Sequence, residues 1–246
     1  MNPIWLPASL FGGFFQAWRT ALQQRLRAEL SVSGAGLVRY LYGLPFALLF
    51  TAVWLSVRHA AVPAFGSAFL GLALVGAVTQ MAGTILLILA FGHRGFVVGT
   101  AFSKTEAIQA ALVTAIFFHE RLPLLAWAGI VAGVAGVLIL ALVGRGISAR
   151  QILGSLGQPA ALYGLGAGSM FACAAIAIKF ATAELTGLDV VASALVTLVV
   201  VMAMQSALHL AWIVARDRDT LSAVVWTWRS SSQVGLLSAL GSACWY

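Results

Sequence analysis

Long apolar runs alternate with short polar stretches along almost the whole chain. Each run holds about 20 residues, enough at 1.5 Å per residue for a helix to cross a hydrocarbon core of about 30 Å. The connecting stretches are short, so neighbouring helices should be antiparallel and form one bundle. The pattern predicts about eight spans, at approximately 4–24, 36–57, 69–91, 95–118, 124–143, 160–181, 190–215 and from 233 onward.

The composition places the chain in the membrane class. Of its 246 residues, 61% are hydrophobic and only 9% are charged, whereas a soluble domain carries about 25% charged residues. The net charge of +7 does not indicate a nucleic-acid partner, because the arginines lie singly or in pairs between apolar runs, as topological anchors do. We therefore predict an all-α integral membrane protein, a multi-span helix bundle in contact with the lipid bilayer.

The order of the spans indicates an internal repeat. Residues 71–82 align without gaps onto 235–246, and the span at 160–181 opens with Ala-Leu-Tyr-Gly where the first opens with Ser-Leu-Phe-Gly. A five-helix repeat has an odd number of spans, so its second copy enters the membrane inverted, as in many secondary transporters. We expect a complete first repeat at 1–146 and an incomplete second repeat of three spans at 159–246.

The short length of the final span predicts that the sequence is a fragment of a longer protein. It holds about 14 residues before the last position, roughly 21 Å of helix, which is too short to cross the membrane. We expect a ten-span parent of two inverted five-helix repeats, of which about eight spans are present and the second repeat is truncated. On this expectation the 246-residue chain does not transport alone.

Two opposite charges lie near the middle of the apolar run at 95–118. Lys104 and Glu106 would each cost about 2.5–3.5 kcal/mol at the centre of a membrane helix. A chain that keeps both should place them against protein or water, where they can bind a ligand. In a regular helix their side chains point about 160° apart, so we expect no direct pair and a partner for Lys104 on another helix. Ser103 and Gln109 share the face of Glu106.

A second polar feature follows one face of the first span. Gly12, Gln16, Arg19 and Gln23 recur at intervals of four, three and four residues, which makes one stripe on a helix. Arg39 begins the next span at the same side of the membrane. We predict a substrate or ion site formed by Gln16, Arg19, Arg39, Tyr42, Gln80, Ser103, Lys104 and Glu106.

Structural explanations compete with this site. Arg19 and Arg39 could extend to the membrane interface, as long basic side chains near helix ends do, and Glu106 could form an ion pair that locks helices together. For Lys179 and His209, near the ends of their spans, we favour the interface over a function. Gly129, Gly133 and Gly136 favour close helix packing, with dimerisation as the alternative.

Motifs for enzymatic or metal chemistry are missing from the sequence. It contains no Walker motif, nucleophile elbow, His-Glu-x-x-His or Cys-x-x-Cys. His59, His93 and His119 lie in three different loops, which does not predict a metal site. We expect neither an enzyme nor a cofactor.

One segment resembles a known family. Glu106 is followed by an apolar helix, then by His119-Glu-Arg-Leu-Pro123, then by the Gly-rich run that begins Trp127-Ala-Gly-Ile-Val-Ala-Gly. This order resembles the end of an EamA repeat, found in the drug/metabolite transporter superfamily, with His119 where that family usually has Gly. The resemblance implies ten spans, a place in the bacterial inner membrane as a multi-pass protein, and transport of small metabolites.

The basic residues in the loops predict how the chain is oriented in the membrane. Alternate loops on one side hold Arg25, Arg27, Arg94, Arg145, Arg150, Arg216, Arg218 and Arg229, whereas the other side has Arg58 and Arg121, with Lys179 at a span end. The positive-inside rule places the arginine-rich side in the cytoplasm and the N-terminus outside. The resemblance implies cytoplasmic termini. We favour the charge count.

The sequence thus favours a secondary transporter of a small metabolite that works by alternating access, with or without coupling to protons or other ions. Arg19, Arg39 and Lys104 outnumber Glu106, which favours a substrate with an anionic group such as a carboxylate. The alternative is a non-transporting membrane scaffold or a degenerate, truncated relative. The oligomeric state is left open.

Overall fold

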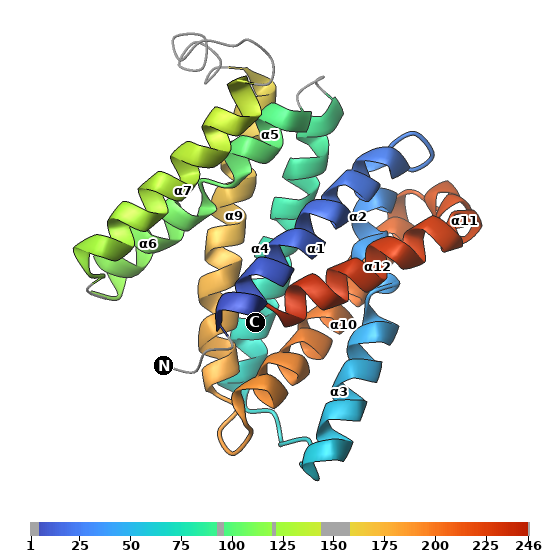
Figure 1. Ribbon diagram of the computed structural model, residues 1–246. Coiled ribbons are helices and arrows are strands. Elements are labelled where there is room, and N and C mark those ends of the chain that lie inside the picture. Colours follow the sequence, from blue (N-terminus) through green and yellow to red (C-terminus); the bar gives the residue numbers. More distant parts are fainter. Residues whose placement is uncertain (1–4, 93–95, 120–121, 144–157, 246) are drawn as a thin grey trace. The chain divides into compact units, whose positions relative to one another are not determined.

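The computed structural model describes residues 5–92, 96–119, 122–143 and 158–245 (Figure 1). Within these ranges every regular element is a helix and none is a strand. The helices are α1 (Trp5–Leu26), α2 (Val32–Leu41), α3 (Leu44–Arg58), α4 (Ser67–Gly92), α5 (Phe96–Ser103), α6 (Glu106–Phe117), α7 (Leu124–Val143), α9 (Pro159–Ala183), α10 (Val190–Arg216), α11 (Asp219–Trp226) and α12 (Trp228–Ala243).

Four helical stretches of the described chain are long and apolar enough to cross a membrane, by length and composition. They are Val32–Arg58, which joins α2 and α3, Ser67–Phe91 in α4, Pro159–Ala183 and Val190–Arg216. Each has 25 to 27 residues, and they correspond to the second, third, sixth and seventh predicted spans. The structure thus supports a helical membrane protein. The arrangement in two inverted repeats stays a prediction.

Helix α1 carries its polar residues inside and its apolar residues outside. Arg19 and Gln23 are buried, whereas Phe11, Phe14 and Trp18 are each more than half exposed. A surface helix of a water-soluble protein has the opposite polarity. The predicted polar stripe is confirmed as one inward face, and the apolar outer face is compatible with contact to lipid.

The described helices fall into two compact units. One comprises Met1–Val78 with Ala177–Tyr246, and the other comprises Thr79–Ile176. In the first unit, α1 lies along α12, and α10 packs against α2 and α3 (Figure 1). A core cluster of Ala47, Leu198, Met202 and Ala239 joins α3, α10 and α12. These units are defined by packing, so the repeat boundaries at 146 and 159 stay a prediction.

The junction between α2 and α3 is a packed break in a long span. Pro45 stands in the first turn of α3, where its missing N–H would have no helical partner in any case. Gly235 of α12 lies directly against this junction, and a Cβ at Gly235 would overlap the backbone of Tyr42 and Gly43. The missing side chain therefore lets α12 approach the break.

The N-terminus of α10 is capped by Asp189. Its Oδ1 accepts hydrogen bonds from the N–H groups of Val191 and Ala192 at 3.0 and 3.1 Å. The indole N–H of Trp54 in α3 lies 3.3 Å from both carboxylate oxygens, and Arg58 Nε lies 3.5 Å from Oδ2. The Ala192 N–H first, and then the Trp54, Val191 and Arg58 groups, hold the pKa of Asp189 below its usual value, against a smaller opposing effect of burial.

The second unit contains α5, α6 and α7 with the adjoining parts of α4 and α9. Helix α7 packs against α5 and α6, but not through its glycines. At Gly129, Gly133 and Gly136 an added Cβ would meet no described atom within 4 Å. The predicted packing through this Gly face is therefore wrong for the part of the chain that the structure describes, and dimerisation through it stays a hypothesis.

Candidate functional site

The predicted fourth span is two helices separated by a turn. Ser103 Oγ donates to the carbonyl of Thr100 at 2.8 Å, and Thr105 Oγ1 donates to the carbonyl of Phe102 at 2.7 Å. The backbone N–H of Lys104 also bonds three residues back instead of four. Hydroxyl side chains that bond to nearby carbonyls compete with the regular helical ladder. This run of polar residues ends α5 at Ser103, and α6 begins at Glu106.

The turn changes the relation between the two charged side chains. Lys104 Nζ lies 3.9 Å from Glu106 Oε1, so the prediction that they point apart is wrong. That prediction assumed a regular helix through this segment, whereas α5 ends at Ser103 and α6 begins at Glu106. The pair is local in sequence and joins only α5 to α6, which weakens the alternative in which Glu106 locks distant helices together. The two side chains remain 34% and 22% exposed.

Polar groups from α6 and α9 extend this cluster. Gln109 Nε2 donates to Thr105 Oγ1 at 2.9 Å, and Ser169 Oγ donates to Gln109 Oε1 at 2.6 Å. We name Ser103, Lys104, Thr105, Glu106, Gln109 and Ser169 the break cluster. Thr105 and Ser169 were not predicted from the sequence, although the unbroken polar run from Ser103 to Glu106 indicates a helix break.

Glycines on α9 bring that helix against the turn. A Cβ at Gly164 would lie 2.6 Å from the Gly99 carbonyl oxygen and 3.0 Å from Phe102 Cβ. At Gly168 it would lie 3.0 Å from the Ser103 carbonyl oxygen. Because Gly164 and Gly168 have no side chains, α9 can approach the backbone of α5 this closely. Helix α9 therefore forms one wall of the break cluster.

The predicted arginines lie in the first unit and are covered by protein. Arg19 and Arg39 are each 4% exposed, which argues against their extension to the interface. Gln16, one turn before Arg19, accepts a 2.7 Å hydrogen bond at its carbonyl from Thr20. Tyr42 donates its hydroxyl proton to the Val224 carbonyl at 2.9 Å.

A further buried polar group was missed. His209 of α10 is 2% exposed, and its Nε2 lies 2.9 Å from Ser33 Oγ of α2. Gly36 leaves room for the ring, since a Cβ there would lie 3.0 Å from His209 Cε1. The prediction that His209 extends to the interface is therefore wrong. Lys179, by contrast, is exposed, and its place at the interface stays a prediction.

The eight predicted site residues divide between the two units. Gln16, Arg19, Arg39 and Tyr42 belong to the first unit, and Gln80, Ser103, Lys104 and Glu106 belong to the second. The break cluster brings together the last three of these. A single cavity shared by all eight stays a prediction.

Some predictions fall outside the described residues, among them those that concern His93, Arg94, Glu120, Arg121, Arg145 and Arg150. Orientation by loop charge depends on several of these and stays a prediction. Among the residues that the structure describes, no three His, Cys, Asp or Glu side chains are grouped to hold a metal ion.

Two comparisons with known proteins gave no match. No protein-family model matches the chain, and no curated protein matches its sequence.

Proposed function

We propose that this protein is a secondary transporter that moves a small metabolite across the cell membrane by alternating access, with the break cluster as part of its substrate or ion path. The observation that carries the proposal is the interrupted span, α5 and α6, with Lys104 and Glu106 at the interruption. The two helices hold 8 and 12 residues, so the interruption falls within the hydrocarbon core if they cross it together.

Energetics favour a functional explanation of the ion pair. Each charge costs about 2.5–3.5 kcal/mol to place at the centre of a membrane helix. For an ion pair such as this one, 3.9 Å apart, the cost of taking two charges out of water can exceed their mutual attraction. The attraction between Lys104 and Glu106 therefore does not explain why both charges are kept. Contact with water, an ion or a substrate explains it better.

An interrupted helix also suits transport. Discontinuous helices form the central sites of many secondary transporters, because the ends of half-helices present backbone groups to ions and substrates. The first N–H groups of an α-helix have no partner within that helix, and here they lie beside Glu106 at the start of α6. Glu106 itself can exchange a proton or pair with a cation.

The buried arginines support an anionic substrate. Arg19 and Arg39 are covered by protein, where a guanidinium can bind a carboxylate with two parallel hydrogen bonds. They give the first unit two covered positive charges, Arg19 and Arg39. We therefore propose a metabolite with a carboxylate or similar anionic group.

The resemblance to EamA repeats is part of this proposal, and one backbone feature supports it. His119 has φ of 55°, in the left-handed region that glycine adopts most readily. This is the position where the EamA pattern usually has Gly. Membership of that family would place the protein in the bacterial inner membrane as a multi-pass transporter of two inverted repeats.

Flux measurements test the proposal. The protein encoded by its native gene would be reconstituted in vesicles and tested for uptake and efflux over a panel of anionic, neutral and cationic metabolites. We expect saturable flux of one or more anionic metabolites, absent from protein-free vesicles. A folded, correctly inserted protein that moves none of the panel would contradict the proposal and favour the scaffold alternative.

A further inference from the structure

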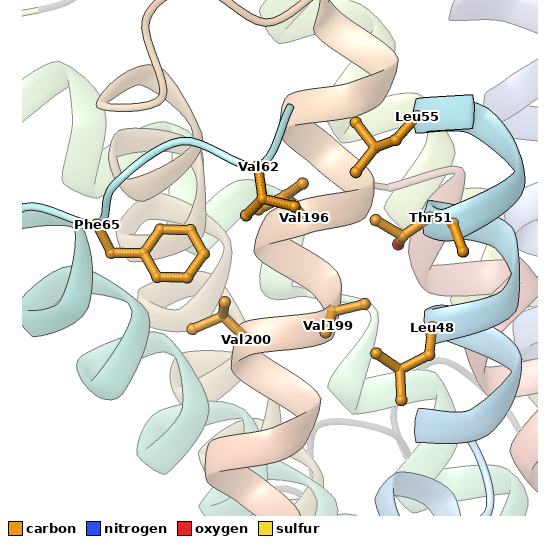
Figure 2. Close-up of a pocket in the computed structure, with 9 residues that line it drawn as sticks. Leu48, Thr51, Leu55, Val62, Phe65, Val196, Val199 and Val200 are labelled. Atoms are coloured by element: carbon orange, nitrogen blue, oxygen red, sulfur yellow. The ribbon is translucent and has the colours of Figure 1, made fainter. Parts of the chain in front are cut away.

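An apolar groove lies on the first unit, apart from the polar residues discussed so far. Its volume is about 330 Å³, at the lower end of the range of about 300–1,000 Å³ that ligand pockets occupy. Leu48 of α3 forms one side, Val199 and Val200 of α10 form the floor, and Val62 and Phe65 from the connection between α3 and α4 form the other side (Figure 2).

The walls of the groove offer no polar group to a ligand. Thr51 is the one lining residue with a polar side chain, and its hydroxyl is bonded to the carbonyl of Ala47 at 2.8 Å and that of Leu195 at 3.2 Å. The deep residues Leu55 and Val196 are 9% and 3% exposed. A polar metabolite would gain no orientation here, whereas a hydrocarbon chain would fill the groove without an unsatisfied group.

Charged and aromatic groups mark one end of the groove. Helices α3 and α10 run in opposite directions there, because Arg58 at the end of α3 lies beside Asp189 at the start of α10. Trp54 also contacts Asp189 through its indole N–H. Tryptophan and arginine are typical of the membrane interface. The groove therefore begins at headgroup level and runs toward the hydrocarbon centre, from Leu55 to Leu48, over about 10 Å of helix.

Arg58 has donors to offer at that end. Its side chain is 56% exposed, and its ion pair with Asp189 is formed by Nε at 3.5 Å. The guanidinium carries five N–H donors in a planar fork, which matches the oxygens of a phosphate. An apolar channel that ends at an exposed guanidinium has the chemistry of a phospholipid, with its chain in the channel and its phosphate at the interface.

We propose that this groove is a binding site for one acyl chain of an anionic glycerophospholipid, whose phosphate contacts Arg58. The inference rests on the membrane setting of the helices and not on the proposed transport function. Bulk lipid is as apolar as the groove, so retention of this lipid comes from the fit of the chain between α3, α10 and the α3–α4 connection and from the contact with Arg58.

Photo-crosslinking tests the site. The protein would be placed in nanodiscs of phosphatidylglycerol that carries a diazirine on its acyl chain, and the labelled peptides would be mapped. We expect label on α3, on the connection that contains Val62 and Phe65, and on α10 near Val199. Leu48→Trp fills the groove and should lower this labelling several-fold. Leu49→Trp is the matched control, because Leu49 is the next residue, is also about half exposed and does not line the groove.

A second variant separates the headgroup from the chain. Arg58→Gln should lower the preference for phosphatidylglycerol over phosphatidylcholine about fivefold in native mass spectrometry, because a basic residue near an anionic surface is worth about one kcal/mol. Arg216→Gln, an exposed arginine at the other end of α10, should leave that preference unchanged. If Leu48→Trp does not fold, Val62→Trp on the opposite rim replaces it.

Three outcomes would overturn the inference. One is equal labelling of the Leu48→Trp and Leu49→Trp proteins. Another is a crosslinked dimer through this groove, which would assign it to a second copy of the chain. The third is a preference for phosphatidylglycerol that survives Arg58→Gln, which would remove Arg58 as the group that recognises the anionic headgroup.

Discussion

At the scale of single residues, Arg19 is the strongest sign of an anion site in the first unit, because it is charged and only 4% exposed. We predict that Arg19→Gln lowers the flux of an anionic substrate about tenfold, since a hydrogen bond to a charged group is worth about 1.5–3 kcal/mol. Arg19→Lys keeps the charge but loses the planar fork, so its flux should be intermediate.

The matched control for this prediction is Arg25→Gln, at the exposed end of the same helix, which should transport normally. Size-exclusion profiles in detergent would show that each variant folds. Transport of an anionic metabolite that is insensitive to both Arg19 variants would remove Arg19 from the site.

Asp189 gives a prediction for pH. Its pKa is lowered in the folded protein, so the ionised cap stabilises the fold above the usual pKa of 3.8. That contribution is lost as pH falls below this value and through the lower folded-state pKa. Thermal unfolding in detergent between about pH 3 and 6 should show the wild-type midpoint falling with acid more steeply than that of Asp189→Asn. Parallel curves would mean that the cap does not contribute to stability.

At the scale of elements, the contact of α9 with α5 depends on Gly164. A methyl group there would meet the Gly99 carbonyl at 2.6 Å, and backbone atoms cannot rotate away as a flexible side chain can. We predict that Gly164→Ala destabilises the protein by about 1–3 kcal/mol, the usual cost of overpacking, measured as a lower unfolding midpoint in detergent.

Gly133→Ala in α7 is the comparison for that variant. A Cβ there meets no described atom within 4 Å, and alanine favours a helix over glycine by up to about 1 kcal/mol. Its midpoint should stay equal or rise. A fall as large as that of Gly164→Ala would indicate that the Gly face of α7 is packed against a second copy or another partner.

Helix periodicity predicted some elements well and failed at one. The stripe of Gln16, Arg19 and Gln23 on α1 followed from spacing alone, because α1 is a continuous helix. The same spacing rule misplaced Lys104 relative to Glu106, because hydroxyl groups at Ser103 and Thr105 bond to carbonyls three residues back and interrupt the helix. Hydrogen bonds of this kind change the direction of the helix axis and of the side chains, but they leave the hydropathy of the segment unchanged.

Burial of single polar residues was less predictable than the spans. His209 lies near the end of a long apolar helix, where position alone suggests the interface, but Ser33 from α2 binds it inside the unit. That contact joins residues 176 positions apart, and nothing in the local sequence indicates it. The packing predicted for the glycines of α7 was wrong for a related reason. Their spacing permits close packing but does not show which helix would pack there.

At the scale of the whole molecule, the polarity of the surface agrees with a membrane setting. Large apolar side chains such as Leu124, Leu125 and Trp226 are more than 80% exposed, whereas arginines and a histidine are buried. Hydropathy predicted a membrane protein because the free-energy cost of exposing so much apolar surface to water is large. The repeats, the family and the transported substrate depend on similarity and chemistry that hydropathy does not contain, and they remain proposals.

We propose that the charged residues at the α5–α6 interruption serve transport. Flux of the accepted metabolite through vesicles with Glu106→Gln protein tests it most directly, because this change keeps the shape of the side chain and removes its charge. Glu29→Gln is the control, since Glu29 is an exposed acid in the connection between α1 and α2. We predict that the Glu106→Gln protein inserts and folds normally but loses flux, while Glu29→Gln keeps it. Wild-type flux from correctly inserted Glu106→Gln protein would show that the charge of Glu106 has no role in transport.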